Sequence, residues 1–365
     1  MHHRLTTSRH YFVATAAVYV PCWTYPWLRT CFEYGTQKAR IFVEDNGFTR
    51  ITIPVNFTWQ PGQHCFLRFY SLGIASALTS HPFTICSLPS ADPERPSELI
   101  FYIRHRGGFT ARLYHLALKQ PGMQVPVLVD GPYGGIDNQK YFHSNRLVVI
   151  AGGAGAGWSL PFVEQFLRHR SFGESQIAPR STSSEIEEKL MSQEPSTIQH
   201  HTHGPRSLYV ILATRDIATQ TWFQNTLNQL MSNYKQSVGS SPDLTIEVHL
   251  TGEAEKIVQP VAASDLEKGL DGSSSDEATT SKRLSDQMMA TADGLGSKEE
   301  VRGRPNLPAI IEEEGKTEER AAVFCCSPLE MQNDVRNAVA KQNLKIVRSG
   351  KRKGMYLHLE HFSWA

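Results

Sequence analysis

One short segment combines residue types that can hold a flat ring system with one polar side. It reads His81-Pro-Phe-Thr-Ile-Cys-Ser87. A flavin ring needs a strand edge whose backbone and hydroxyl groups reach its polar side, while its other side stays apolar. Pro82 fixes the backbone, Thr84 can donate a hydrogen bond toward the reactive ring nitrogen, and Ser87 can contact a ribityl or phosphate oxygen. Taken alone, the segment is also an ordinary β-strand, so its interpretation depends on the neighbouring motifs.

Two glycine-rich segments can each bind phosphate. The first reads Arg104-His-Arg-Gly-Gly-Phe-Thr110, at the start of a predicted helix over residues 110–118. Glycines there expose free backbone amides, the helix dipole attracts an anion, and two arginines add charge for a pyrophosphate. The second reads Ala151-Gly-Gly-Ala-Gly-Ala-Gly157, between a predicted strand and a predicted helix. That order predicts a nucleotide-phosphate cradle, although a glycine-rich turn by itself is a weak signal.

The ends of two later strands and of the chain carry further candidates. Arg215 follows the next predicted strand, where a cation suits the 2′-phosphate of NADPH, so NADPH is expected rather than NADH. The last predicted strand of this region ends in Cys325-Cys-Ser-Pro328. A thiol there can pack near a nicotinamide, although Cys325 itself fits a buried apolar filler better. The terminal Trp364 can stack on the flavin or complete a strand.

These motifs fall in two regions with different patterning. Over residues 37–130, short runs rich in Val, Ile, Phe and Tyr alternate with Gly and Pro turns, which predicts a small antiparallel barrel. The turn Asp130-Gly-Pro-Tyr-Gly-Gly135 closes this region and can lie against the same cofactor. After about residue 145, fully apolar runs alternate with helical stretches. That alternation predicts a doubly wound α/β domain with parallel strands.

Composition narrows the function classes. A net charge of +1 argues against a nucleic-acid-binding protein. The six cysteines include no CxxC pair, which argues against a disulfide framework or a zinc site and fits a reducing compartment. Residues 172–205 and 252–320 are rich in Ser, Thr, Glu and Gln, and we predict that they are disordered insertions. The histidines of the first insertion fit a solvated loop better than a metal site.

The N-terminal region has a different character. No charged residue lies between Arg9 and Arg29, and this stretch is long enough to cross a hydrocarbon core of roughly 30 Å. Aromatic residues cluster near its exit, as at a membrane interface. Pro21 and Pro26 weaken the helix, and a signal peptide or a buried helix is the alternative. We expect a transmembrane helix over about 11–28.

Taken in order, the motifs resemble the ferredoxin-reductase-like part of the fungal ferric reductases, which are relatives of the NADPH oxidases. The likeness runs over nearly the whole chain and includes the following: PGQH from residue 61, HPFT from 81, GGFT from 107, GPYGG from 131, GGAGAG from 152, Cys326-x-Pro328 and the terminal aromatic. It implies a ferredoxin-NADP reductase-like fold with a membrane-domain remnant over 1–33, an FAD-binding β-barrel over 34–142 and an NADPH-binding α/β domain over 143–365.

The resemblance also implies roles for individual residues. Thr84, Cys326 and Trp364 are expected at the reacting rings. The residues expected to contact FAD are His81, Pro82, Phe83, Thr84, Ser87, Arg104, Gly107, Gly108, Thr110 and Gly131. Those expected to contact NADPH are Gly152, Gly153, Gly155, Gly157, Arg215, Cys326 and Pro328.

The activity implied by the resemblance is that of a ferric-chelate reductase in iron uptake. Hydride passes from NADPH to FAD, and single electrons pass to haem b in a membrane domain and then to ferric chelates. The protein is expected at a membrane, the plasma membrane in this family, with most of the chain in the cytosol. Alternatives are a superoxide-producing oxidase and a degenerate nucleotide-binding fragment.

Three departures from the family pattern bear on these expectations. Ser327 stands where the family usually has glycine, and its side chain could crowd the nicotinamide. Gly157 stands where the phosphate loop usually carries Ser or Thr. The haem-bearing helices of the family have no counterpart in the sequence, so a truncated gene product or a fragment is expected.

Overall fold

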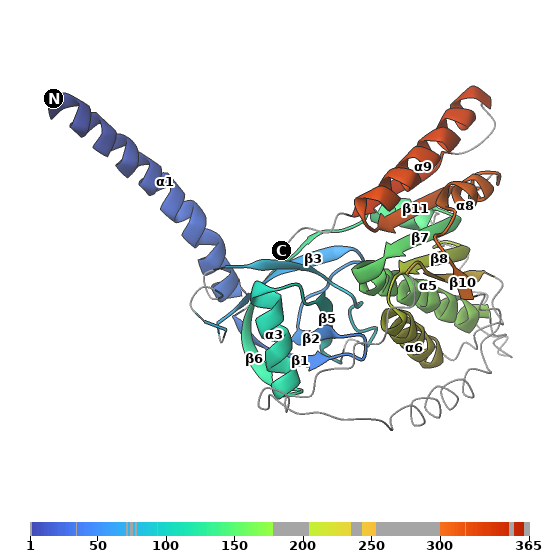
Figure 1. Cartoon of the computed structure of the whole chain (residues 1–365), viewed down its shortest axis with the longest axis horizontal. Coiled ribbons are helices and arrows are strands. Elements are labelled where there is room, and N and C mark those ends of the chain that lie inside the picture. Colours follow the sequence, from blue (N-terminus) through green and yellow to red (C-terminus); the bar gives the residue numbers. More distant parts are fainter. Residues whose placement is uncertain are drawn as a thin grey trace, which may run out of the picture.

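The computed structural model describes two lobes and an N-terminal helix (Figure 1). The described residues are 2–33, 35–70, 72–73, 76, 79–92, 94–177, 204–234, 243–252, 300–317, 319–349 and 354–360. Helix α1 (His2–Glu33) extends away from the first lobe. The candidate ring-stacking residue Trp364 and the histidines at 200, 201 and 203 lie outside the described residues.

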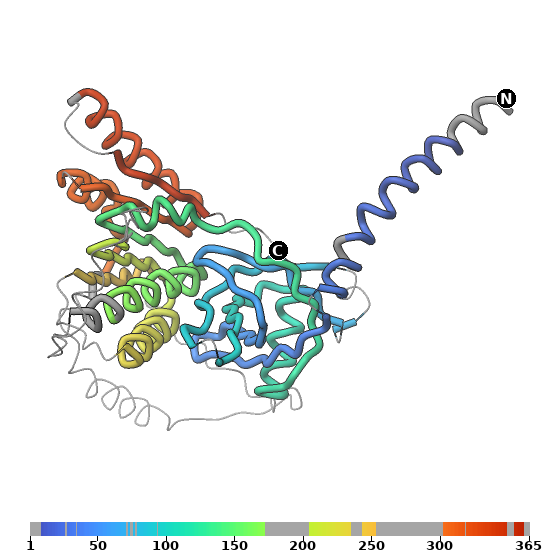
Figure 2. Tube along the Cα trace, turned by 180° about the vertical axis from the view of Figure 1, so that it is seen from behind, coloured from blue at the N-terminus to red at the C-terminus, as the bar shows by residue number. Residues whose placement is uncertain are grey.

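The first lobe is an antiparallel barrel, as predicted. Its strands are β1 (Thr36–Val43), β2 (Phe48–Val55), β3 (Gln63–Phe69), β4 (His81–Thr84), β5 (Ser97–Arg104) and β6 (Gln124–Gly134), in the order β4-β3-β6-β1-β2-β5. The two outer strands approach each other where the Cys86 amide donates to the Ile100 carbonyl at 2.8 Å. Helix α3 (Gly108–Lys119) covers the barrel and inserts Phe109, Leu113 and Ala117 into its core. The tube in Figure 2 shows the barrel beside the second lobe.

The second lobe is a parallel six-stranded sheet with helices on both faces, also as predicted. The strands are β7 (Arg146–Gly152), β8 (Ser207–Thr214), β9 (Leu244–Leu250), β10 (Glu300–Arg302), β11 (Ala321–Cys326) and β12 (Tyr356–Glu360), in the order β10-β9-β8-β7-β11-β12. One face packs against α5 (Ala156–Ile177) and α6 (Ile217–Asn233), and the other against α8 (Leu307–Glu314) and α9 (Leu329–Ser349). Near-continuous apolar strands are needed because both faces are buried.

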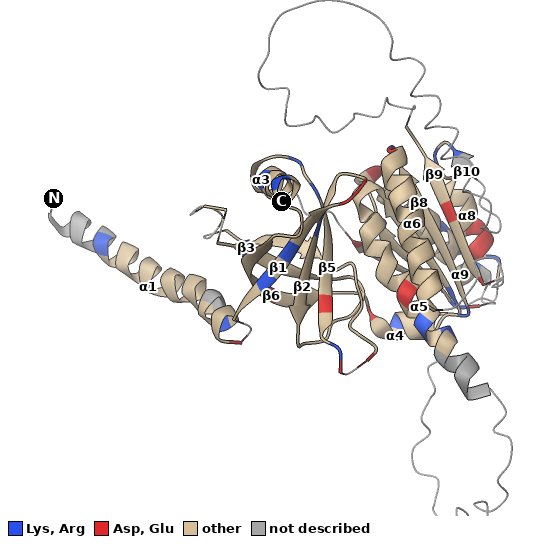
Figure 3. Cartoon of the chain, turned by 90° about the horizontal axis from the view of Figure 1, so that it is seen from below, with Lys and Arg blue, Asp and Glu red and all other residues tan. Residues whose placement is uncertain are grey.

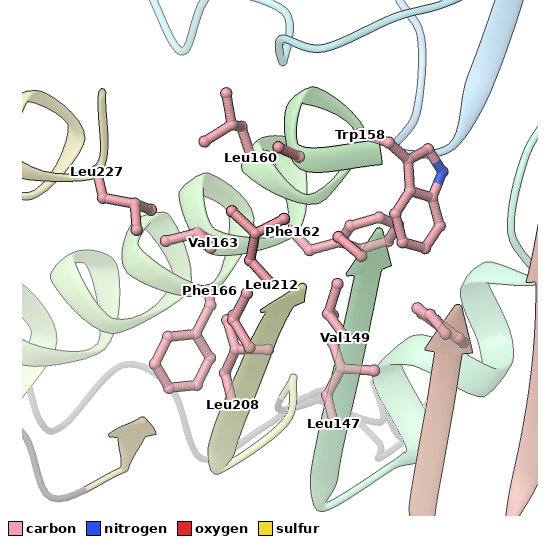
Figure 4. Packing of buried hydrophobic residues seen from close by; sticks show 14 of the residues in the cluster. Leu147, Val149, Trp158, Leu160, Phe162, Val163, Phe166, Leu208, Leu212 and Leu227 are labelled. Carbon is pink, nitrogen blue, oxygen red and sulfur yellow. The ribbon is translucent and has the colours of Figure 1, made fainter. Parts of the chain in front are cut away.

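The core between α5 and the sheet holds the glycine loop in place. Trp158, Phe162 and Phe166 project from α5 onto Val149 and Leu212 of β7 and β8 (Figure 4). The rings of Trp158 and Phe162 lie 4.7 Å apart. Because the short 3-10 turn Gly153–Gly155 joins β7 directly to α5, this packing fixes the loop between them.

A short helix lies between the two lobes and packs against the second. Helix α4 (Asn138–His143) begins at its cap Asp137, whose side chain accepts hydrogen bonds from two backbone amides of the first turn. Ile136 and the fully buried Tyr141 belong to the core of the second lobe. The predicted boundary at residues 142 and 143 stays a prediction.

The predicted membrane span needs a correction. Helix α1 forms over the predicted stretch, but among the residues that the structure describes no helix is both long and apolar enough to cross a membrane. Composition is the cause, because Tyr, Thr, Trp and Pro residues between Tyr11 and Leu28 lower its mean hydropathy.

The second predicted insertion is also too long. Strand β10 and helix α8 both lie within residues 252–320. Leu307 and Ile311 of α8 are buried in the core, and Asn306 caps the helix by accepting from the Ala309 amide. The apolar residues of α8 span only two turns and lie in an acidic stretch, so their pattern was too weak to predict this helix. The first predicted insertion likewise begins inside α5, and residues 178–203 and 253–299 lie outside the described part of the chain.

Candidate nucleotide and flavin site

Strand β4 presents the HPFT segment at the edge of the barrel sheet. Among the described residues it pairs only with β3, with His64 opposite Thr84 and Leu67 opposite His81. All four side chains of β4 are half-buried. Within the described residues no hydrogen-bond partner is recorded for the Thr84 hydroxyl, whereas its carbonyl lies 3.4 Å from the Cys86 thiol, which donates to it. Strand β4 therefore has the open edge that the sequence predicted.

The glycine pair ahead of α3 forms an open turn. Gly107 and Gly108 have φ angles of 131° and 53°, and no atom lies within 4 Å of a β-carbon placed on either. Glycine is needed here for its backbone conformation. The Thr110 hydroxyl closes the turn by donating to the Gly107 carbonyl at 3.0 Å and accepting from the Arg106 amide at 3.1 Å. Arg104 is exposed beside this turn.

An aromatic stack brings the HPFT and GGFT motifs together. The rings of His81 and Phe109 lie 4.2 Å apart and 9° from parallel. Burial, and then the charge of Arg112, lowers the pKa of His81. The Arg112 guanidinium in turn donates to the Ser76 hydroxyl at 3.0 Å. The neutral imidazole can therefore pack face to face with Phe109 and fix β4 relative to the start of α3.

Ser87 and Gly131, both predicted to contact FAD, also make contacts within the barrel. The Ser87 hydroxyl donates to the Glu98 carbonyl at 2.8 Å and accepts from the Ile100 amide at 3.1 Å. A β-carbon on Gly131 would lie 2.9 Å from the Cys65 sulfur, so this glycine allows close packing against β3. These contacts hold β3 and β5 next to the β4 edge, and contact of Ser87 and Gly131 with FAD stays a prediction.

The second lobe brings the glycine loop and the Cys-Ser-Pro segment into contact. A β-carbon on Gly152 would lie 2.6 Å from Cδ of Pro328 and 3.0 Å from Cβ of Ser327. Gly153 has a φ of 54° and open space around it. The two glycines thus have different roles. Gly152 permits close packing of two loops, and Gly153 shapes a cradle that an anion can approach.

The Ser327 side chain is buried beside the Cys325 thiol. It is 1% exposed, and its hydroxyl lies 3.1 Å from the Cys325 sulfur, which belongs to the core on the α8 and α9 side. Whether this serine crowds the nicotinamide stays a prediction. Cys326 is 3% exposed, and burial is the main reason that its pKa is well above the ordinary value, followed by the charge of Glu360.

Gln332 is a residue that the sequence did not single out. Its amide nitrogen donates to the Ser327 and Glu360 carbonyls, both at 2.8 Å, and the side chain is buried. It ties the loop after β11 to the end of β12. A glutamine inside an amphipathic helix gives no sequence signal for this bridge.

The lobes meet where the two predicted segments adjoin. A β-carbon on Gly157 would lie 3.0 Å from the Cys86 sulfur and 3.1 Å from Cδ2 of Tyr102. The Trp222 ring packs on Tyr102, with ring centroids 4.7 Å apart. Arg168 donates to the Pro89 carbonyl at 2.7 Å across the same junction. The HPFTICS segment and the glycine loop are therefore neighbours, and Gly157 is required for contact between the lobes.

The loop after β8 presents Arg215 to solvent. Arg215 is exposed, and a β-carbon on Gly252 would lie 2.7 Å from its carbonyl oxygen. The adjacent carboxylate belongs to Asp216, which caps α6 by accepting from the Ala218 amide and the Thr219 hydroxyl. Asp216 is exposed as well, but its carboxylate accepts hydrogen bonds in the helix cap.

The residues present fit a flavin and a nicotinamide dinucleotide. Open glycine turns at Gly107 and Gly153 leave room for phosphate groups, and the unpaired edge of β4 offers backbone and hydroxyl groups to a ring. No group of three or more metal-binding side chains occurs within the described residues.

Family comparisons agree with this arrangement. Residues 144–340, more than half of the chain, match a family model described as "Ferric reductase NAD binding domain". Residues 35–137 match one described as "FAD-binding domain". The boundaries of the matches correspond to the two lobes.

Curated relatives include fungal metalloreductases. The chain is 33% identical over 129 residues to "Ferric/cupric reductase transmembrane component 7" of Saccharomyces cerevisiae, covering 35% of this chain and 19% of the relative. It is 25% identical over 320 residues to "Probable ferric reductase transmembrane component" of Candida albicans, covering 86% of this chain and 40% of the relative. The chain thus spans well under half of the length of these relatives.

Two solved structures similar to this chain are the following. The Amycolatopsis cytochrome P450 reductase GcoB has a TM-score of 0.49 at 12% identity, covering 90% of this chain and 70% of that chain. A ferredoxin NADP+ reductase from Neisseria gonorrhoeae with bound FAD and NADP has a TM-score of 0.49 at 11% identity, covering 89% of this chain and 98% of that chain.

Proposed function

Because this chain belongs to the ferric reductase family through the NAD-binding domain of residues 144–340, we propose that it is the flavin- and NADPH-binding part of a ferric-chelate reductase. The observation that carries the proposal is the contact between Gly157 and Cys86. It joins the loop expected to hold a dinucleotide to the strand expected to hold a flavin, so the two reacting rings can meet at one junction.

The barrel supplies the flavin site. The edge of β4 from His81 to Thr84 lies along the ring, with the Thr84 hydroxyl directed to a ring nitrogen. The turn at Gly107 and Gly108, with Arg104 beside it, takes the pyrophosphate through backbone amides and charge. The stack of His81 on Phe109 holds the ring site and the phosphate site at a fixed separation.

The second lobe supplies the nucleotide site. Gly152, Gly153 and Gly155 hold the pyrophosphate, and Arg215 takes the 2′-phosphate that distinguishes NADPH from NADH. The loop of Cys326 and Pro328 borders the nicotinamide. The Cys326 side chain is 3% exposed and acts by packing and by excluding water.

The chain contributes alignment to the reaction. When bound, the nicotinamide and the flavin supply the hydride chemistry. The contacts at Gly157, Trp222 and Arg168 fix the distance between the lobes. In such a transfer the main contribution of the protein is to hold the reacting atoms about 3–3.5 Å apart.

The name of one relative supports a proposal for the later electron acceptors. The Saccharomyces cerevisiae relative is named a ferric/cupric reductase transmembrane component. We infer that this chain works at a membrane, the plasma membrane, passes single electrons to haem b in a separate membrane domain, and so serves the reduction of ferric chelates in iron uptake.

The proposal is tested with the purified full chain in detergent. After loading with FAD, NADPH should bleach the flavin absorbance under anaerobic conditions, and the reduced protein should transfer electrons to an artificial acceptor. NADH should react more slowly, and Arg215→Ala should raise the KM for NADPH much more than that for NADH. A chain that binds no flavin, or binds it without reduction by either nucleotide, contradicts the proposal.

A further inference from the structure

A second arginine, Arg302, lies near Arg215 at the carboxyl end of the parallel sheet. Arg302 is the last residue of β10 and pairs with Leu250 of β9, and Leu250 pairs with Thr214 of β8. Arg215 follows Thr214 directly. Neighbouring strands are about 4.8 Å apart, so Arg215 and Arg302 leave the same sheet edge about 10 Å from each other. Figure 3 shows a basic segment beside the label of β10.

The strand ends between these two arginines are tied together. The Thr251 amide donates to the Thr214 carbonyl at 2.7 Å, and the Gly303 amide donates to the Leu250 carbonyl at 3.0 Å. The Thr251 hydroxyl also donates to the Thr214 carbonyl, at 3.1 Å. The hydrogen-bond ladder therefore continues to the last residue of each strand, and the backbone positions of both arginines are fixed.

Arg302 lies on the sheet face that α6 covers. Side chains directly opposite each other on paired strands share a face, and successive residues alternate. Leu212 and Val248 pack toward α5 and α6, so Thr214, Leu250 and Arg302 are on that same face by alternation and pairing. The first turn of α6 begins after Asp216. Arg302 and Arg215 thus border the same corner of the second lobe.

These two arginines have no carboxylate partner in the described part of the chain. Arg215 and Arg302 are exposed, and neither takes part in an ion pair there, in contrast to Arg146, whose guanidinium is bonded to Glu314 at 2.7 Å. Arg304 is different, because its guanidinium lies 3.9 Å from the exposed Glu330 carboxylate. Two uncompensated guanidinium groups at one corner attract an anion with several acceptor oxygens.

We propose that Arg302 binds the 2′-phosphate of NADPH together with Arg215, so that β10 completes the nucleotide site. This rests on the proposed function, since it assumes that the nucleotide lies across this edge. A phosphate dianion can accept from both planar guanidinium groups at once. The sequence placed residue 302 in an insertion without structure, and the pairing of β10 with β9 brings it to the site.

The test measures nucleotide binding by calorimetry with the full chain. Adenosine 2′,5′-bisphosphate and AMP are the probes, because they differ only by the 2′-phosphate. Arg302→Gln should weaken the bisphosphate about tenfold and leave AMP unchanged, which corresponds to the loss of one charged hydrogen bond. Arg302→Lys should lose less, since it keeps the charge.

Two exposed arginines serve as matched controls. Arg304→Gln should change the affinity for the bisphosphate by less than about threefold, because its charge is already opposed by Glu330 and exposed pairs contribute little. Arg206→Gln, at the opposite end of the sheet before β8, should have no effect.

Three results would overturn the inference. An Arg302→Gln protein that binds the bisphosphate as wild type, while Arg215→Gln does not, excludes Arg302 and leaves the proposed function standing. Equal losses for AMP and the bisphosphate would place Arg302 away from the 2′-phosphate. A wild-type chain that binds neither probe would remove the nucleotide site and the proposed function with it.

Discussion

Replacing Gly157 by alanine should slow flavin reduction by separating the lobes. The new β-carbon would lie 3.0 Å from the Cys86 sulfur and 3.1 Å from Tyr102. Carbon atoms in good contact are about 3.5–4.0 Å apart, so the lobes must move by about 0.5 Å. A misplacement of about 1 Å can cost about 100-fold in rate. We therefore expect a loss of about tenfold, or about 1.4 kcal/mol in the barrier.

Anaerobic stopped-flow measurement of flavin reduction by NADPH gives this rate directly. Cys86→Ala removes the sulfur that the new β-carbon would contact. In that background Gly157→Ala should slow flavin reduction only about threefold, because Tyr102 is still in contact. Gly315→Ala is the matched control, because its β-carbon would be 3.1 Å from Gln342, far from the junction. It should lower stability and leave the rate unchanged. An undiminished rate for Gly157→Ala, or a cost that Cys86→Ala does not reduce, refutes the reasoning.

Three further results are expected. Burial lowers the pKa of His81 from 6.5, so the unfolded chain binds the proton more readily than the folded chain. The free energy of unfolding should therefore fall as the pH drops below 6.5, and His81→Phe should weaken this dependence. Chemical denaturation at several pH values measures it. Burial raises the pKa of Cys86 to about 12. Brief alkylation at mildly alkaline pH should therefore label the exposed Cys22 and leave Cys86 unmodified until the chain is unfolded. Peptide mass analysis identifies the labelled cysteines. Arg168→Met loses the 2.7 Å hydrogen bond to the barrel and should slow flavin reduction several-fold, whereas Arg170→Met, whose guanidinium packs on a ring inside the second lobe, should not.

The local patterns in the sequence predicted the fold well. Alternating short strands with glycine turns gave the barrel, and fully apolar runs gave the parallel sheet, because both depend on which faces of a strand are buried. The strand containing His81 and the loop from Gly152 were predicted as separate motifs. Their meeting could be inferred only from the resemblance to a family.

What the sequence could not supply depends on tertiary contacts. The hydroxyl of Ser87 is engaged by β5, and no local pattern distinguishes that role from a cofactor contact. Gly157 looked like one more glycine of a phosphate loop, yet the atoms close to it belong to the other lobe. Arg302 became a candidate nucleotide-binding residue only through the pairing of β10 with β9. The order of strands in a sheet cannot be predicted from any short segment of sequence.

The most direct test of the account is a structure of this chain with FAD and NADP+ bound. The flavin ring should lie along His81 to Thr84, with the nicotinamide between it and the loop at Cys326, and the reacting atoms should be within about 3.5 Å. A flavin bound away from β4, or a nucleotide that does not touch the loop from Gly152 to Gly155, would contradict the assignment of this junction as the site of hydride transfer.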